Sequence, residues 1–207
     1  TLMRVKSQKF GAINNNCYLV VDEDTNKSAL VDCSEDSQKM YDLIGDTDLE
    51  YILLTHGHFD HIIGVKGIKQ KYNAKVVISA PDEPMLSSGK LSLASFMDAP
   101  QNNVECDIKV SDNDIIKLAS LEIKVLSTPG HTKGSVCYLV ENALFSGDTL
   151  FKMSCGRTDF PSGSVQEMMN SLKKLKNLDG NYTVYTGHDE ITDLDFERKN
   201  NPYMSKL

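Results

Sequence analysis

Short apolar segments of strand length recur along the whole chain, separated by turn-forming and charged residues. Runs rich in β-branched, aromatic and aliphatic side chains, bounded by Gly, Asn, Asp and Pro, are typical of strands. The clearest segments are residues 17–21, 29–31, 51–54, 75–78, 121–126, 136–140, 143–145 and 183–185. A strand-like stretch also covers residues 3–6, so the pattern predicts eight or more strands.

Helical periodicity is clearest at residues 165–175, where apolar side chains recur with a spacing of three or four positions. Ser164 and Glu167 have the spacing of a capping box at its start. Weaker helical patterns follow Ser34 and His61, and a last helix is predicted to start at Thr192. Strands interspersed with helices, without a repeat or linker, predict one α/β (α+β) domain over residues 1–207.

Composition narrows the class of protein. The 207 residues are 40% hydrophobic and 25% charged, as in an ordinary globular protein. The net charge of −7 and the lack of a basic strip argue against a nucleic-acid partner, and no apolar run is long enough to span a membrane. The five widely spaced cysteines form no Cys-x-x-Cys pair, so we expect a reducing, cytoplasmic location. With nucleic acid and membrane disfavoured, a small molecule is the expected substrate. The sequence leaves the oligomeric state open.

The densest chemistry follows the predicted strand at residues 51–54. The segment that comes next reads Thr55-His56-Gly57-His58-Phe59-Asp60-His61. Imidazole and carboxylate are ligands that zinc, iron and manganese accept, and one tight turn can supply ligands to two adjacent ions. This segment therefore predicts a metal site.

Three further side chains of this kind also follow predicted strands: His131, Asp148 and His188. A single histidine after a strand is more often a surface residue, but that interpretation would have to hold for all five histidines of the chain. The candidate ligands are His56, His58, Asp60, His61, His131, Asp148 and His188. A structural zinc site uses four ligands, whereas seven suit two divalent ions, with zinc favoured and iron or manganese as alternatives.

Motifs along the whole chain resemble those of the metallo-β-lactamase-fold hydrolase superfamily and, within it, the glyoxalase-II-like (hydroxyacylglutathione hydrolase-like) branch. Besides residues 56–61, the resemblance rests on residues 129–132, Gly134-Ser135, residues 146–151, residues 155–160, Gly187-His188, Glu197-Arg198 and Asn201-Pro202. It implies an αββα four-layer sandwich with the site at one edge of two packed sheets.

The resemblance also implies a ligand assignment. One ion would be held by His56, His58 and His131. The other would be held by Asp60, His61 and His188. Asp148 would bridge the two ions, and a bridging hydroxide would attack the substrate carbonyl. Asp60 and Asp148 are therefore the candidate catalytic residues of a metal-dependent hydrolase.

The substrate is less well specified. The motif turns contain no obvious general acid, which favours a thioester over an amide because a thiolate leaves without protonation; an ester is the other candidate. Arg157 lies near the place where the family carries a basic residue for glutathione, although pairing with Asp159 explains it equally well. Nineteen residues follow His188, so we expect the family's glutathione-binding helical domain to be absent.

Three alternative functions remain. A persulfide dioxygenase shares several of these motifs and would hold a single Fe(II) on His56, His131 and Asp148. A phosphodiesterase or nuclease would use the same ligands, but the acidic net charge argues against it. A metal-binding protein without activity would be expected to lack a ligand, and all seven are in place.

Overall fold

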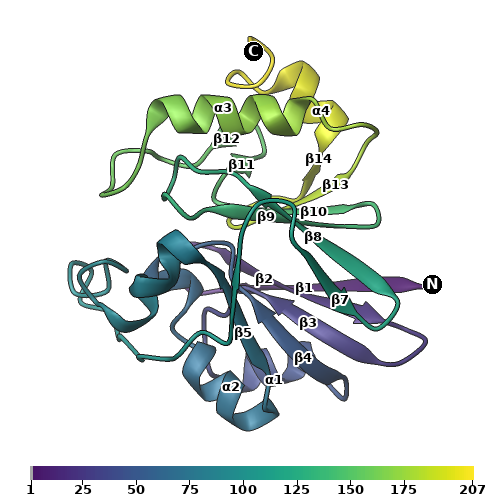
Figure 1. The fold of residues 1–207 in the computed structure, drawn as a ribbon, viewed down its shortest axis with the longest axis vertical. Coiled ribbons are helices and arrows are strands. Elements are labelled where there is room, and N and C mark those ends of the chain that lie inside the picture. The colour runs from purple at the N-terminus through teal and green to yellow at the C-terminus, as the bar shows by residue number, and fades with distance from the viewer. Residues whose placement is uncertain (1) are drawn as a thin grey trace.

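The computed structural model describes residues 2–207, which form two six-stranded sheets packed face to face with helices on both outer faces (Figure 1). The first sheet has the order β1-β2-β3-β4-β5-β6, with α1 and α2 on its outer face. The second has the order β14-β13-β10-β9-β8-β7, with α3 and α4 on its outer face. The αββα four-layer sandwich implied by the resemblance is confirmed.

The strand bounds agree with the apolar segments to within a few residues. The first sheet contains β1 (Met3–Phe10), β2 (Asn15–Asp22), β3 (Lys27–Val31), β4 (Asp48–Leu53), β5 (Lys75–Ser79) and β6 (Ile108–Val110). The second contains β7 (Ile115–Leu118), β8 (Leu121–Ser127), β9 (Val136–Val140), β10 (Ala143–Gly147), β13 (Thr183–Thr186) and β14 (Thr192–Asp193). A separate short hairpin consists of β11 (Leu150–Phe151) and β12 (Ser154–Cys155).

Within residues 2–207, four α-helices and two 3₁₀ segments complete the fold. They are α1 (Gln38–Ile44), α2 (Val65–Tyr72), α3 (Val165–Lys176), α4 (Leu194–Asn200), η1 (Phe59–His61) and η2 (Ala80–Ser87). None of the helices within residues 2–207 has the length and apolar character needed to cross a membrane.

The central strands β2, β3, β9 and β10 are buried on both faces, which explains why they read as near-continuous apolar runs. Buried and exposed positions alternate in β1, β7 and much of β8. The inner faces share one cluster, in which the rings of Tyr18 and Phe145 meet across the sandwich with centroids 5.5 Å apart. Met40 of α1 and Ile68 of α2 belong to the cluster behind the first sheet. Met168 belongs to the cluster behind the second. The predicted apolar faces of these helices are therefore the faces that pack.

The strand ends that carry the histidines meet at one edge of the sandwich. Backbone hydrogen bonds join the turns that follow different strands: the Val136 amide donates to the Thr55 carbonyl at 2.9 Å, and the Gly187 amide donates to the Gly147 carbonyl at 2.8 Å. Because β10 and β13 are parallel, their carboxyl ends lie at the same edge, as expected for the turns that carry Asp148 and His188.

Two local predictions need correction at helix starts. The last helix begins at Leu194, not Thr192, because Thr192 and Asp193 pair with β13 and the Asp193 carboxylate accepts a hydrogen bond from the Phe196 amide. The capping box is only half formed. Ser164 Oγ accepts from the Glu167 amide at 3.1 Å, while the Glu167 carboxylate lies 3.4 Å from Lys133 Nζ.

The C-terminal helix anchors the β11–β12 hairpin. Glu197, which is fully buried, accepts hydrogen bonds from the Met153 amide at 2.7 Å and from Asn201 Nδ2 at 3.0 Å. Asn201 Nδ2 also donates to the Ser154 carbonyl at 3.0 Å. Buried polar groups that satisfy each other in this way fix a local arrangement, so the tail holds the hairpin beside the histidine-bearing edge.

Candidate metal centre

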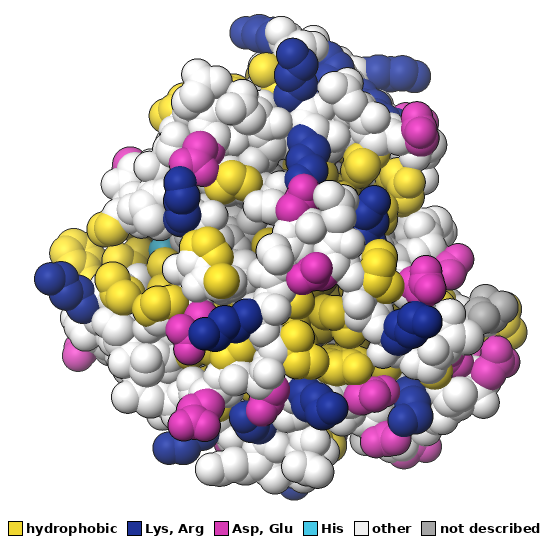
Figure 2. Space-filling view, viewed as in Figure 1, with side chains coloured by type: hydrophobic (Ala, Val, Ile, Leu, Met, Phe, Trp, Pro, Cys, Tyr) yellow, Lys and Arg dark blue, Asp and Glu magenta, His cyan; other side chains and the backbone are white. Residues whose placement is uncertain are grey.

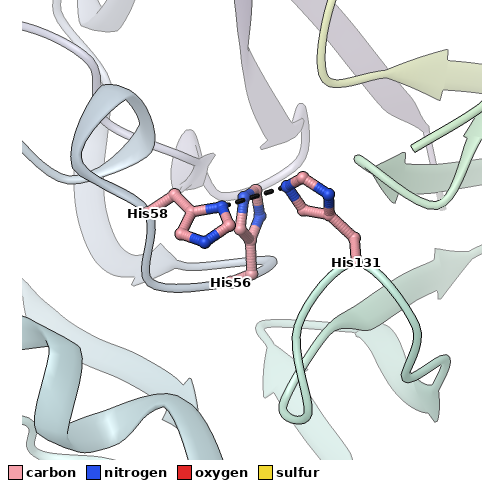
Figure 3. Close-up of side chains that lie close together, drawn as sticks. All are labelled: His56, His58 and His131. Atoms are coloured by element: carbon pink, nitrogen blue, oxygen red, sulfur yellow. Dashed lines mark hydrogen bonds between the residues drawn. The ribbon is translucent and has the colours of Figure 1, made fainter. Parts of the chain in front are cut away.

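The structure brings all seven predicted ligands together in two adjacent groups. The first consists of His56, His58 and His131, and the second of Asp60, His61, Asp148 and His188. Within each group, one potential ligand atom per residue lies within 4.8 Å of all the others. Figure 3 shows the first group: two imidazoles from the turn after β4 face the imidazole on the turn after β8.

Asp148 lies between the two groups. Its Oδ2 atom is 3.7 Å from His56 Nε2 and 3.4 Å from His131 Nε2, both in the first group. The same oxygen is 3.3 Å from His188 Nε2, and its partner Oδ1 is 3.4 Å from His61 Nε2. One carboxylate therefore contacts imidazoles of both groups.

The backbone before Asp148 allows this placement. Gly147 has φ +52°, in the left-handed region that favours glycine. A Cβ atom at this position would lie 2.6 Å from the Cβ of Thr55, so the turn after β10 also depends on glycine to approach the turn after β4. A larger residue here would move the carboxylate away from the histidines.

Most of the imidazoles are oriented by a hydrogen bond at the nitrogen that points away from the centre, as is usual for metal-ligating histidines. The pairs are His56 Nδ1 with Thr55 Oγ1 at 3.1 Å, His61 Nδ1 with Asp32 Oδ2 at 2.9 Å, His131 Nδ1 with the Arg157 carbonyl at 2.7 Å, and His188 Nδ1 with the Ile13 carbonyl at 2.9 Å. In each pair the Nε2 atom is left to face the centre.

The inward atoms fit divalent ions. Three of them are buried without a hydrogen-bond partner among the described residues: the Nε2 atoms of His56 and His61, and Oδ1 of Asp148. His58 instead directs its Nδ1 atom towards the group, 3.0 Å from His131 Nε2. Such atoms are costly unless something else pairs with them. Ligands about 2.0–2.1 Å from one tetrahedral ion lie about 3.3–3.4 Å apart, close to the separations around Asp148. The donor set therefore suits a dinuclear metal centre.

The two groups differ in electrostatic character. Burial, aided by the neighbouring histidines, lowers the pKa of His58 to about 3 and that of His56 well below its usual range. In the second group burial opposes the charged imidazole, but the hydrogen bonds that His188 donates to the carboxylates of Asp148 and Asp60 outweigh it and raise the pKa of His188 to about 10. His56 and His58 are therefore neutral ligands, and the carboxylates of the second group attract cations.

Asp32 and Asp82 are functional candidates that the sequence reasoning missed. Asp32 is buried at the end of β3 and accepts hydrogen bonds from the Thr55 amide and hydroxyl, both at 2.8 Å, in addition to its contact with His61. Its position directly after a predicted strand was the available signal, because the ligand-bearing turns share it. An isolated aspartate did not stand out from the turn-forming aspartates of the chain.

Asp82, in η2, ties the two turns of the first group together. Its carboxylate accepts from the Gly57 amide at 3.0 Å, the Gly134 amide at 2.9 Å and the Thr132 hydroxyl at 2.7 Å. Burial raises the pKa of Asp82, which shows how strongly the site removes the carboxylate from water. Asp82 lies in an irregular segment, where no periodic pattern of residues indicated a buried carboxylate.

Comparisons with known proteins agree with this geometry. The family described as the metallo-beta-lactamase superfamily matches residues 10–188. The chain belongs to the metallo-β-lactamase superfamily. The match covers every ligand of the two groups, from His56 to His188.

Relatives place this superfamily member in the glyoxalase-II-like branch. It is 34% identical to a hydroxyacylglutathione hydrolase from Pelagibacter ubique, over 85% of this chain and 67% of the relative. It is 28% identical to the hydroxyacylglutathione hydrolase GloC of Haemophilus influenzae, over 94% of both chains. Among solved structures, the BLEG-1 B3 metallo-beta-lactamase matches with a TM-score of 0.89 at 27% identity, over 98% of this chain and all of the other.

A cavity of about 460 Å³ opens beside both ligand groups. One wall comes from the first half of the chain and includes Phe59, Leu93 and Phe96. The other comes from the hairpin and the loop that follows it, including Arg157 and Phe160. The cavity is large enough for a small-molecule substrate.

Arg157 pairs with Asp159, which was one of its two predicted roles. The guanidinium donates to both carboxylate oxygens, at 2.6 and 2.7 Å, and lies 4.0 Å from the centre of the Phe160 ring. The side chain is more than half exposed and faces the cavity that the superfamily site forms. Its substrate-binding role stays a prediction.

Asp32→Asn is expected to weaken metal binding by roughly 10–100-fold at the group that contains His61, because outer hydrogen bonds of this kind orient the ligand and raise its basicity. Calorimetric titration of metal-free protein with Zn²⁺ would measure this. Asp112→Asn, a partly exposed carboxylate paired with Lys174, is the control. Unchanged affinity in Asp32→Asn would show that Asp32 does not position His61.

Proposed function

We propose that the protein is a metal-dependent hydrolase with a dinuclear site that cleaves thioesters, like the hydroxyacylglutathione hydrolases it resembles. The observation that carries the proposal is the position of Asp148, whose carboxylate touches imidazoles of both ligand groups. A carboxylate shared between two complete groups suits two ions held side by side.

The proposed division of ligands follows the two groups. His56, His58 and His131 would hold one ion. Asp60, His61 and His188 would hold the other. Asp148 would serve both. When bound, two divalent ions supply a water nucleophile that is acidic at neutral pH and a Lewis acid for the substrate carbonyl. We propose zinc as the metal, with iron or manganese as alternatives, because imidazole and carboxylate suit all three.

The side chains themselves would do three things in the reaction. Those of His56 and His58 remain neutral and keep a lone pair available for an ion, because burial lowers their pKa values. Asn15 Nδ2 donates to Asp60 Oδ2 at 3.0 Å and so fixes the carboxylate that faces the cavity. Asp60 is thereby held ionised as a ligand, because His61 and His188 outweigh burial and lower its pKa well below the usual range. A thiolate leaving group would depart without a proton donor.

A test of the function compares three substrate classes on protein loaded with zinc, iron or manganese. We expect cleavage of S-lactoylglutathione, no O₂ uptake with glutathione persulfide, and no release from a chromogenic phosphodiester. Thioester cleavage that requires metal supports the proposal. O₂ uptake without thioester cleavage would contradict it.

A persulfide dioxygenase is the second candidate, and one observation favours it. Asp148 Oδ2 lies within 3.7 Å of the Nε2 atoms of both His56 and His131, so these residues form a face of two histidines and one carboxylate. Such a face suits a single non-haem iron with open positions. The O₂ arm of the experiment, together with one iron per chain, would identify this function.

Arg157→Ala is expected to raise KM for S-lactoylglutathione by about 3–10-fold with little change in kcat, because an exposed guanidinium at the cavity can contact the carboxylates of glutathione. Steady-state kinetics measure the two constants separately. Lys117→Ala, an exposed cation on β7, is the matched control. An unchanged KM would assign Arg157 only the structural pairing with Asp159.

A further inference from the structure

The cavity wall formed by Phe59, Leu93, Phe96 and Met97 is apolar, and part of it is exposed. Phe96 is 84% exposed and Met97 56%, and both line the cavity together with Leu93 and Phe59. Figure 2 shows apolar side chains gathered at the left of the molecule beside the visible histidine. Large apolar side chains left in water next to a reactive centre mark a surface that binds an apolar group.

Hydrogen bonds hold this wall in place. Its segment, residues 88–101, is tied to the turn of the metal ligands, because the Phe59 amide donates to the Ser92 carbonyl at 2.9 Å. The Ser92 hydroxyl donates to Gln101 Oε1 at 2.6 Å, which closes the segment on itself. The part of the segment around Ser92 is therefore held beside the turn that carries the candidate metal ligands.

The backbone at Leu93 supports the same conclusion. Leu93 has φ +70°, a conformation that L residues other than asparagine, aspartate and glycine seldom adopt. Its side chain is nevertheless almost fully buried, at 9% exposure, where it lines the cavity. Backbone strain of this kind persists only where the surroundings impose it, often at ligand sites.

Charge distinguishes the two walls. Of the described residues that line the cavity, Arg157 alone is a lysine or arginine, and it lies on the wall formed by the second half of the chain. An anionic thiol carrier would therefore bind on the Arg157 wall, in competition with Asp159, the present partner of the guanidinium. The acyl group on the other side of the scissile carbonyl is then directed towards Phe96 and Met97, which offer it no polar partner.

From these contacts we infer that the preferred substrates are thioesters of uncharged, apolar acyl groups longer than lactoyl, with the acyl chain packed against Leu93, Phe96 and Met97. This inference rests on the proposed hydrolase function and narrows its substrate class. A three-carbon hydroxyacyl group would leave most of this apolar wall in water.

The experiment compares S-acetyl-, S-lactoyl- and S-octanoylglutathione on the metal-loaded protein, so that the carrier is constant. We expect kcat/KM to be about tenfold or more higher for octanoyl than for acetyl, from burial of apolar surface. Phe96→Ala is expected to reduce this ratio severalfold. Leu91→Ala is the control, because Leu91 is an exposed apolar residue of the same segment that does not line the cavity.

A binding measurement separates the inference from the function. Calorimetry with the unreactive thioethers S-octyl- and S-methylglutathione should show tighter binding of S-octyl, reduced in Phe96→Ala and not in Leu91→Ala. If no thioester is cleaved but this pattern holds, the apolar site stands and the hydrolase function fails. If thioesters are cleaved with equal kcat/KM for acetyl and octanoyl, or if Leu91→Ala acts like Phe96→Ala, the inference is wrong and the hydrolase stands.

Discussion

Asp148→Ala should abolish thioester cleavage, with a loss of more than about 1,000-fold in kcat/KM, and lower the metal content to one ion or fewer per chain. The reason is geometric: the carboxylate lies within 3.7 Å of Nε2 atoms in both ligand groups, so its removal takes a ligand from each. Its carboxylate also places a negative charge among four buried imidazoles, which would repel one another when protonated.

The control for Asp148→Ala is Asp179→Ala, which removes an exposed carboxylate beyond the end of α3. Elemental analysis and steady-state kinetics on both variants complete the comparison. Retention of two metals and of turnover in Asp148→Ala would exclude the bridging role.

Asp82→Ala has the largest expected effect on stability. Three buried donors would lose their acceptor, the Gly57 amide, the Gly134 amide and the Thr132 hydroxyl, and unsatisfied buried donors cost about 1–3 kcal/mol each. We expect a decrease of about 3 kcal/mol in the free energy of unfolding. The decrease is smaller than the sum over three donors, because the alanine variant no longer has to desolvate the Asp82 carboxylate. For a chain of this size, Tm would fall by roughly 6–12 °C.

Thermal unfolding of the metal-free protein measures this effect without the contribution of bound ions. Asp112→Ala serves as the comparison, because that carboxylate is partly exposed and its loss should cost less than about 1 kcal/mol. Asp82→Ala should also weaken metal binding at His58 and His131, since it releases the two turns that carry them. Equal Tm values for the two variants would show that Asp82 does not join the turns.

All the candidate ligands could be predicted because each follows a segment with the apolar pattern of a strand. A strand end fixes the direction of the next turn, and parallel strands such as β10 and β13 deliver their turns to one edge of the sheet. The three histidines and one aspartate at residues 56–61 then indicate which edge of the sheets holds the metal ligands. The packing of α1, α2 and α3 was predictable for a similar reason, because the helical spacing of apolar residues defines the buried face.

Other features depend on contacts between segments distant in sequence. The very short strands β11, β12 and β14 are too short to show a periodic pattern in the sequence. Glu197 and Asn201 hold the β11–β12 hairpin, and β14 forms by pairing with β13. Asp82 acts across 50 residues on Thr132, and nothing local to either residue shows the pairing. The exposure of Phe96 in the cavity likewise follows from the hydrogen bonds that shape residues 88–101.

Metal stoichiometry tests the central claim most directly. Protein stripped with a chelator would be titrated with Zn²⁺ by calorimetry, and the bound metal measured by elemental analysis after removal of the excess. The two ligand groups predict close to two ions per chain in the wild type, and close to one when His61 is replaced by alanine. A wild-type value of one ion, unchanged in His61→Ala, would contradict a dinuclear site.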